Sequence, residues 1–261
     1  MAITLRSERE IELLRCAGAV VADVLSKLQE VAKPGMTTAQ LDRIAGQMTG
    51  EARAEALFKG VRSPHARIPF PGVICASINE QVVHGIPSEE AQLKDGDILS
   101  VDFGVRLNGY CGDAAVTIGI GQVAEDNRRL MAVTSRALDV AIAEAAPGRR
   151  WSQVAARMQR LVEAEGFSVV KDFVGHGIGR KMHEEPRVPN FVGDDLPGND
   201  FLLAEGMILA VEPMVNAGDS DVRTLRNGWT VVTKDGKNSA HFEHTIAIRK
   251  DGCEVLTRNR A

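Results

Sequence analysis

Two aspartates, Asp102 and Asp113, flank an Asn-Gly pair in a segment whose side chains alternate between apolar and polar. Asn108-Gly109 is a strong hairpin signal, because both residues tolerate the positive φ of a type I′ turn. With this turn Asp102 pairs with Ala115, and the two carboxylates become diagonal neighbours on one face. Carboxylates placed in this way are able to share a divalent cation. The alternatives are two solvated surface residues, or a one-residue bulge that would put them on opposite faces.

Three further residues have the type and setting of metal ligands. His176 lies among the glycines of the 175–179 segment, and imidazole is the commonest protein ligand for transition metals. Glu212 and Glu243 each interrupt an apolar predicted strand, where a carboxylate is costly unless it is paired or coordinates a cation. A loop histidine and the solvated face of an edge strand are the ordinary alternatives. The whole set suits Mn²⁺, Fe²⁺, Co²⁺ or Zn²⁺, and two such ions would support hydrolysis.

Capping signals and apolar periodicity predict four helices that would position these residues. They begin at the capping boxes Ser7–Glu10 and Thr37–Gln40 and, in the second half of the chain, near residues 127 and 151. The first helix is expected to end near Lys33. Besides the hairpin, strands are predicted at residues 73–78, 169–174, 207–215, 229–233 and 242–248.

The order of two helices followed by strands occurs twice. A shift of 113 positions places Pro34-Gly35 on Pro147-Gly148 and Gln40 on Gln153. This repeat favours a single α+β domain over residues 1–261, with half-repeats of approximately 7–120 and 124–250 and helices on one face of an antiparallel sheet. Chance similarity is the alternative for so short a repeat.

Composition restricts the partners and the compartment. The chain of 261 residues is 44% hydrophobic with a net charge of −4, so it lacks the excess of basic residues that is typical of proteins that bind nucleic acid or anionic membranes. It contains neither a membrane-length apolar run nor, in residues 1–15, the apolar core of a secretory signal. The four cysteines form no C-x-x-C pair, and we expect reduced thiols in a cytoplasmic protein.

A series of short segments extends the set of candidate residues. In order they are Ser77-Ile78-Asn79-Glu80, His84-Gly85-Ile86-Pro87, the hairpin from Asp102 to Asp113, Gly175-His176-Gly177-Ile178-Gly179, Met182-His183-Glu184-Glu185-Pro186, Val211-Glu212-Pro213-Met214 and Phe242-Glu243-His244-Thr245. Together they resemble the methionine aminopeptidases of type I, in the M24 metallopeptidase family, from about residue 11 to residue 248. The stretch between His183 and Glu212 is too short for the helical insertion of type II enzymes, and the resemblance is to the short bacterial form.

The resemblance implies the pita-bread (creatinase/aminopeptidase) fold, a curved antiparallel sheet with helices on its outer face and two pseudo-symmetric halves. It also implies roles for the five candidate ligands. Asp102 would chelate one metal ion, Asp113 and Glu243 would bridge both ions, and His176 and Glu212 would hold the second. Glu212 would in addition act as the base that handles the proton of the attacking water.

Further positions match the substrate site of the family. By the resemblance, His84 contacts the substrate amide nitrogen or leaving group, and His183 contacts the scissile carbonyl oxygen. A neutral histidine is a suitable donor to the charge that develops on that oxygen. The pocket for the methionine side chain would be formed by Phe70, Cys75, Met182 and Trp229.

Two residues depart from the family pattern. Arg67 stands at the pocket rim where an aromatic–X–Gly pattern is common, which places the strictness of substrate selection in question. His241 stands where glutamine is usual beside the last ligand, and it would either tune Glu243 or add a polar contact. Neither departure changes a predicted ligand.

The resemblance implies a metal-dependent aminopeptidase that removes the initiator methionine from nascent proteins when the second residue is small. Its cofactors would be two divalent ions (Co, Mn, Fe or Zn), and its partners would be the N-termini of nascent chains. A transient association with the ribosome is compatible with this role, and we expect a monomer. One alternative is a prolidase or aminopeptidase P, which typically has an additional N-terminal domain for which the residues before Asn79 leave little room. The other is a non-catalytic binding protein on the same scaffold, against which retention of all five ligands argues.

Overall fold

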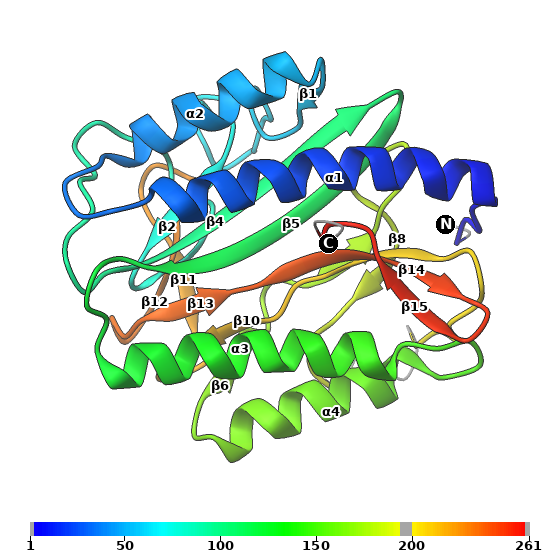
Figure 1. Cartoon of the computed structure of the whole chain (residues 1–261). Coiled ribbons are helices and arrows are strands. Elements are labelled where there is room, and N and C mark those ends of the chain that lie inside the picture. Colours follow the sequence, from blue (N-terminus) through cyan, green and yellow to red (C-terminus); the bar gives the residue numbers. More distant parts are fainter. Residues whose placement is uncertain (1–2, 194–199, 259–261) are drawn as a thin grey trace.

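The computed structural model describes residues 3–193 and 200–258, in which two pairs of helices each precede a group of strands (Figure 1). The first half contains α1 (Glu8–Val31), α2 (Thr38–Glu51), β1 (Glu55–Ala56), β2 (Cys75–Ile78), β3 (Gln81–Val83), β4 (Ile98–Leu107) and β5 (Tyr110–Gly119). The second half contains α3 (Glu125–Glu144), α4 (Trp151–Ala164), β6 (Ser168–Val169), β7 (Gly175–Gly177), β8 (Glu184–Val188), β9 (Ile208–Val211), β10 (Met214–Asn216), β11 (Val222–Thr224), β12 (Val231–Thr233), β13 (Ser239–His241), β14 (Glu243–Arg249) and β15 (Gly252–Val255). No helix in the described residues is long and apolar enough to span a bilayer.

Helices α1 and α2 begin at the predicted capping boxes. The Ser7 amide donates to Glu10 Oε2 over 3.0 Å, and the Thr37 amide donates to Gln40 Oε1 over 2.8 Å. These bonds satisfy backbone donors that the start of a helix leaves without an intrahelical partner. α1 ends at Val31, close to its predicted end.

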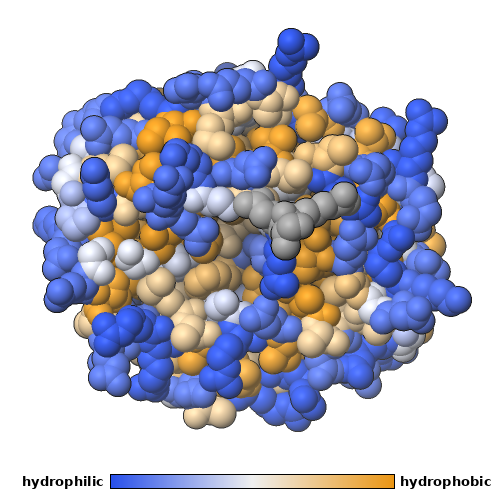
Figure 2. Space-filling model, in the orientation of Figure 1, coloured by the Kyte–Doolittle hydropathy of each residue, from blue (hydrophilic) through white to orange (hydrophobic). Residues whose placement is uncertain are grey.

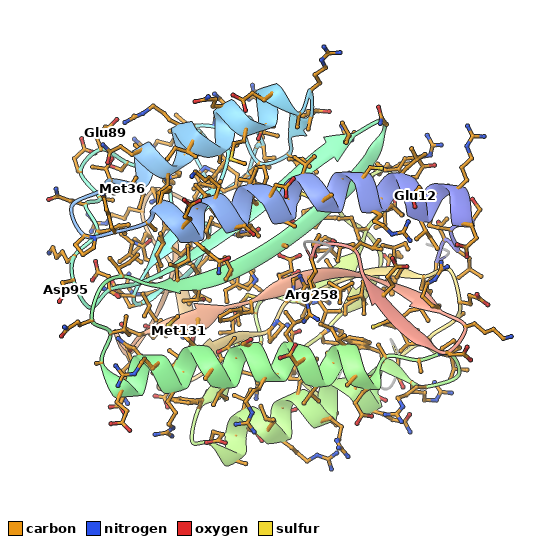
Figure 3. The ribbon with its side chains drawn as sticks, in the orientation of Figure 1. Glu12, Met36, Glu89, Asp95, Met131 and Arg258 are labelled. Atoms are coloured by element: carbon orange, nitrogen blue, oxygen red, sulfur yellow. The ribbon has the colours of Figure 1, made fainter. Side chains whose placement is uncertain are left out.

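The turn that joins the two helices has the same construction in each half. Gly35 and Gly148 have φ of +89° and +80°, a region that glycine enters without strain. Each donates its amide over 2.8 Å to a carbonyl oxygen, of Leu93 in the first half and Leu203 in the second. Met36, labelled in Figure 3, lies in the first of these turns. The two halves therefore repeat one local structure, as the shift of 113 positions predicts.

The strands form one large antiparallel sheet and two small ones. The large sheet has nine strands in the order β1-β4-β5-β14-β9-β7-β8, with β15 on β14 and β2 on β4. The two halves meet where β5 pairs with β14. The small sheets have the orders β13-β10-β6 and β11-β12-β3. This is the predicted α+β pita-bread fold, with the helices on one side of the large sheet (Figure 1).

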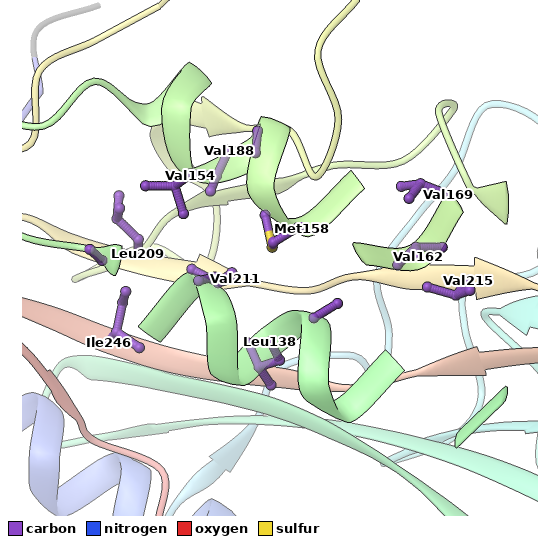
Figure 4. Close-up of a cluster of buried hydrophobic side chains, with 14 of the residues drawn as sticks. Leu138, Val154, Met158, Val162, Val169, Val188, Leu209, Val211, Val215 and Ile246 are labelled. Carbon is purple, nitrogen blue, oxygen red and sulfur yellow. The ribbon is translucent and has the colours of Figure 1, made fainter. Parts of the chain in front are cut away.

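The helices bury one face of the large sheet. In the first half Ala17 and Val21 of α1 pack with Phe103 and Ala114, and a Cβ at Gly112 would lie only 2.7 Å from the α1 backbone. In the second half the residues labelled in Figure 4 fill the space between α3, α4 and the strands β9, β10 and β14. Figure 2 shows hydrophilic side chains spread over this helical side of the molecule, with hydrophobic residues between them. The other face of the sheet is therefore the one available to a site.

Four predicted strands have bounds in the structure that differ by more than one residue, and the first of them, expected at 73–78, begins only at Cys75. The strand expected at residues 169–174 ends at Val169, because the chain then turns so that Phe173 and Val174 face a cavity. The strand expected at 207–215 is interrupted at Glu212-Pro213, where proline has no amide for the ladder. The strand expected at 229–233 begins only at Val231.

All four cysteines are free thiols, as predicted.

Candidate active site

The predicted hairpin is confirmed together with its register. Asn108 and Gly109 have φ of +51° and +80°, which is the type I′ turn that their sequence favours. Asp102 pairs with Ala115 without a bulge between β4 and β5. Asp102 and Asp113 therefore lie on one face of the hairpin, opposite to α1.

Five neighbouring strands bring the five predicted ligands together. In the sheet order β4-β5-β14-β9-β7 they carry Asp102, Asp113, Glu243, Glu212 and His176, with Glu212 directly after the end of β9. Asp113 and Glu243 thus lie between Asp102 on one side and the pair Glu212 and His176 on the other. The segments are distant in the chain, so only the pairing of the two halves makes them neighbours.

Strand register places these side chains on the same face. Ala115 pairs with Asp102 on one side and with Glu243 on the other, so the three side chains point in one direction. His176 and Glu212 join this face through the pairing of β14 with β9 and of β9 with β7. All five predicted ligands consequently face a single cavity.

The ligand atoms lie within reach of a common cation. His176 Nε2 is 3.7 Å from Glu212 Oε1 and 3.9 Å from Asp113 Oδ2. Candidate ligand atoms of Asp113, His176 and Glu243 all lie within 4.8 Å of one another. One buried oxygen each of Asp102, Asp113 and Glu243 has no hydrogen-bond partner in the described residues. Such oxygens are costly unless a cation or a donor satisfies them, so the donor set fits divalent metal ions.

The electrostatics of the carboxylates lead to the same conclusion. Burial raises the pKa of Asp102 to about 7. The pKa of Asp113, Glu212 and Glu243 is also raised, first by burial and then by the charges of the neighbouring carboxylates. A divalent cation among them would reverse this repulsion and keep all four ionised.

The surroundings of His176 orient its ring toward the cluster. Its Nδ1–H donates to Gly177 O over 3.0 Å, which leaves the Nε2 lone pair facing the carboxylates. A Cβ at Gly175 would lie 2.3 Å from Ala210 O, and one at Gly177 would lie 2.2 Å from Glu185 O. The glycines on either side of His176 therefore allow neighbouring backbone to approach closely.

The two predicted substrate histidines also face the cavity. His84 has a φ of +58°, a left-handed conformation that is strained for a residue with a Cβ and that recurs at active sites. Burial and the neighbouring His183 lower the pKa of His84 to about 4, and burial lowers the pKa of His183. Both rings are neutral at pH 7 and each has an N–H available for a hydrogen bond. The His183 ring lies 4.4 Å from that of His176, centroid to centroid.

The remaining predicted residues form an apolar end of the same cavity, whose volume is about 300 Å³. Phe70 and Trp229 meet edge to face at 5.3 Å, and the Trp229 indole N–H donates to Ile68 O over 3.0 Å. Cys75 and Met182 complete this apolar cluster. All eleven predicted site residues line the cavity: Phe70, Cys75, His84, Asp102, Asp113, His176, Met182, His183, Glu212, Trp229 and Glu243.

The two departures from the family pattern have different positions. His241 is buried, and its Nε2 lies 3.9 Å from Glu212 Oε2, so it faces Glu212. Burial and His84 lower the pKa of His241 to about 3. Arg67 is exposed, on the loop whose Ile68 carbonyl binds Trp229.

Sequence reasoning missed six apolar residues of the cavity wall. One of them, Phe173, contacts the His84 ring edge to face at 5.7 Å. Nothing in their local pattern distinguishes them from ordinary core residues, because their role depends on the approach of distant segments. The six are Phe58, Val61, Val83, Phe173, Val174 and Met214.

Comparisons with known proteins agree with this geometry. The model of Metallopeptidase family M24 matches residues 12–250. The methionine aminopeptidase of Clostridium perfringens is 48% identical over 255 residues, covering 98% of each chain. The crystal structure of methionine aminopeptidase from Thermotoga maritima superposes with a TM-score of 0.93 at 41% identity, covering 99% of this chain and 100% of that one.

A more distant structure shows how far the fold extends. Prolidase from Pyrococcus furiosus superposes with a TM-score of 0.72 at 19% identity, covering 98% of this chain but only 66% of that one. The likeness concerns the fold alone. The family match, the high identity over nearly the whole length and the buried carboxylate and imidazole cluster together show that the chain belongs to Metallopeptidase family M24.

Proposed function

We propose that this chain is a methionyl aminopeptidase, which hydrolyses the peptide bond after an N-terminal methionine when the next residue is small. The observation that carries this proposal is the group of buried carboxylate oxygens without partners at one end of an apolar cavity. The names of the closely similar relatives support the same activity.

Two divalent ions, of Co, Mn, Fe or Zn, are the cofactors that we infer. When bound, they would supply an acidified water as nucleophile and polarise the scissile carbonyl. Asp102 lies at one end of the ligand series and Glu212 and His176 at the other, which supports the assignment of Asp113 and Glu243 as residues that contact both ions. Four carboxylates balance four positive charges, so the count of ligands supports two ions.

The protein's own groups would then move the proton and hold the substrate. Glu212 accepts a proton from the attacking water, since its carboxylate lines the cavity and lies 3.7 Å from His176 Nε2 within the cluster. His84 and His183 are neutral at pH 7 and donate N–H bonds to the substrate amide nitrogen or leaving group and to the carbonyl oxygen. The donation to the carbonyl oxygen strengthens as negative charge develops there.

The apolar end of the cavity supports methionine as the first residue. Phe70, Cys75, Met182 and Trp229 offer a narrow surface without charged groups, which suits an unbranched thioether. Arg67 lies outside this cluster, so we propose that its departure from the family pattern affects the rim and leaves the methionine pocket intact.

The wider setting follows from the same proposal. The substrates would be the N-termini of nascent polypeptides, with a transient ribosome contact, and the protein would act in the cytoplasm as a monomer without a nucleic-acid or membrane partner. We further propose that residues 1–261 form one catalytic domain, since the large sheet is continuous across both halves.

A panel of peptides tests the proposal directly. The purified protein is stripped with a chelator, reloaded with Mn²⁺, Fe²⁺ or Co²⁺, and offered Met-Ala-Ser, Met-Lys-Ser and Ala-Pro-Ser. We expect loss of activity on stripping, recovery on reloading, and methionine release from Met-Ala-Ser alone. Preferred cleavage of Ala-Pro-Ser would instead identify a prolidase-like enzyme, and no cleavage by the metal-loaded protein would identify a non-catalytic protein.

A further inference from the structure

The loop that carries Met182 and His183 into the cavity is tied at its base by one carboxylate. Glu184 Oε1 accepts the backbone amide of Arg180 over 2.9 Å and that of Lys181 over 3.1 Å. Glu184 follows His183 directly in the chain. The carboxylate that binds the loop amides therefore also fixes the position of the His183 backbone, from which the imidazole extends. Any movement of this carboxylate is therefore transmitted to two residues of the candidate active site.

Arg6, in the segment before α1, holds the other oxygen of the same carboxylate. Its Nη2 donates to Glu184 Oε2 over 2.5 Å, while its backbone amide donates to Gly206 O over 2.7 Å. The side chains are only 8% and 18% exposed, so water screens this ion pair weakly. Loss of Arg6 would leave the largely buried Glu184 carboxylate without its ion-pair partner.

A second line of contacts links Arg6 to the opposite side of the loop. Arg6 Nη1 lies 3.5 Å from Glu10 Oε1, and the Tyr110 hydroxyl donates to the same oxygen over 3.0 Å. The Arg180 guanidinium stacks 4.7 Å above the centre of the Tyr110 ring. Arg6 thus contacts the loop through Glu184 and, by way of Glu10 and Tyr110, through Arg180.

The loop backbone is shaped to admit the guanidinium. A Cβ at Gly179 would lie 2.0 Å from Arg6 Nη2 and 2.8 Å from Glu184 Oε1. Any larger residue at position 179 would displace the ion pair. The contact between Arg6 and Glu184 therefore depends on a glycine within the loop itself.

We propose that Arg6 is a positioning residue for the reaction: it holds the 178–184 loop in the conformation that places Met182 and His183 against the substrate. Arg6 does not line the cavity, so it acts through Glu184. The effect on catalysis rests on the proposed function of the site, whereas the effect on the loop is independent of it.

The test compares Arg6→Met and Arg6→Lys with the matched control Arg15→Met. Arg15 is also a part-buried arginine, and it forms ion pairs with Glu254, over 2.7 Å, and with Glu12, which Figure 3 labels on α1. Neither ion pair involves the 178–184 loop. We expect kcat/KM on Met-Ala-Ser to fall at least about tenfold in Arg6→Met, since small misplacements of contact groups have effects of this size. We expect Arg6→Lys and Arg15→Met to stay within about threefold of wild type.

Hydrogen exchange supplies a readout that activity does not. The amides of Arg180 and Lys181 should exchange faster in Arg6→Met and at the wild-type rate in Arg15→Met. If Arg6→Met fails to fold, the double variant with Glu184→Gln, which leaves no buried charge, takes its place with the same expected exchange. Exchange and kcat/KM equal to those of Arg15→Met would overturn the proposal. A wild-type protein that releases no methionine would overturn the proposed function, while the exchange rates would still decide whether Arg6 holds the loop.

Discussion

The imidazole of His241 faces the carboxylate of Glu212, with Nε2 of the histidine 3.9 Å from Oε2 of the glutamate. This Nε2 is buried and has no hydrogen-bond partner in the described residues. His241, which stands where the family usually has glutamine, thus lies next to Glu212, the residue that we propose as the general base.

Replacing His241 tests whether this contact supports catalysis. His241→Gln keeps an N–H donor, and we expect kcat within about threefold of wild type. His241→Leu replaces the polar ring, which lies 3.9 Å from Glu212 Oε2, with an apolar side chain. We expect kcat to fall about tenfold with little change in KM, because an apolar neighbour disfavours the ionised form of the carboxylate that acts as base. Steady-state kinetics on Met-Ala-Ser measure both. A leucine variant with wild-type kcat would show that His241 is only a packing residue.

Glu212→Gln is expected to abolish turnover, by about a thousandfold or more, because one substitution removes a metal ligand and the general base. The fold should persist, since the amide has nearly the same volume as the carboxylate. Circular dichroism checks the fold, and metal content after dialysis separates loss of the ion from loss of the base. Turnover at the wild-type rate would remove Glu212 from the mechanism.

The raised pKa values of the four carboxyl groups predict how pH affects the metal-free protein. Above pH 6.5 the Asp and Glu side chains of the unfolded chain have released their protons, and its His side chains, with an ordinary pKa of 6.5, are more than half deprotonated. Folded Asp102, with a pKa of about 7, still binds a proton over part of this range, and burial shifts the pKa of the other three carboxyl groups upward in the same way. The folded state then binds more protons than the unfolded one, so stability falls as pH rises.

The histidines act with the opposite sign but in a different window. His84 and His176 have pKa values lowered to about 4, so their contribution to stability is lost only as pH falls below the ordinary value of 6.5. We therefore expect the urea midpoint of the chelated protein to decrease from pH 6.5 to 8, and less so in Asp102→Asn. Saturating Mn²⁺ should abolish the decrease, because the metal requires deprotonated ligands. A midpoint independent of pH in the chelated protein would contradict the carboxylate cluster.

The aromatic wall of the cavity predicts a change in selectivity. Phe70 is 3% exposed and contacts Trp229 edge to face, so Phe70→Leu should widen the methionine pocket. We expect the ratio of kcat/KM for Met-Ala-Ser over Phe-Ala-Ser to fall about tenfold. Phe103→Leu is the matched control, because Phe103 is fully buried in the core below α1 and lines no part of the cavity. It should lower stability to a similar extent while leaving this ratio unchanged; equal ratios in both variants would exclude Phe70 from the pocket.

The sequence by itself determined the features whose causes lie a few residues apart. Asn108-Gly109 imposes a turn that only residues tolerant of positive φ adopt readily, and this turn alone is sufficient to pair Asp102 with Ala115. In the same way the capping boxes located the starts of α1 and α2. The roles of the remaining ligands were predicted by resemblance to a family, since no local pattern connects them.

The tertiary structure alone decided how distant segments meet. The pairing of Ala115 with Glu243 joins the two halves, and no neighbouring residue encodes it, because it forms only when strands far apart in the chain pair within one sheet. The same holds for Phe173 against His84, for His241 against Glu212 and for Arg6 in the loop before Glu184. Periodicity shows that a side chain is buried, but its partner is set by the packing of the whole core.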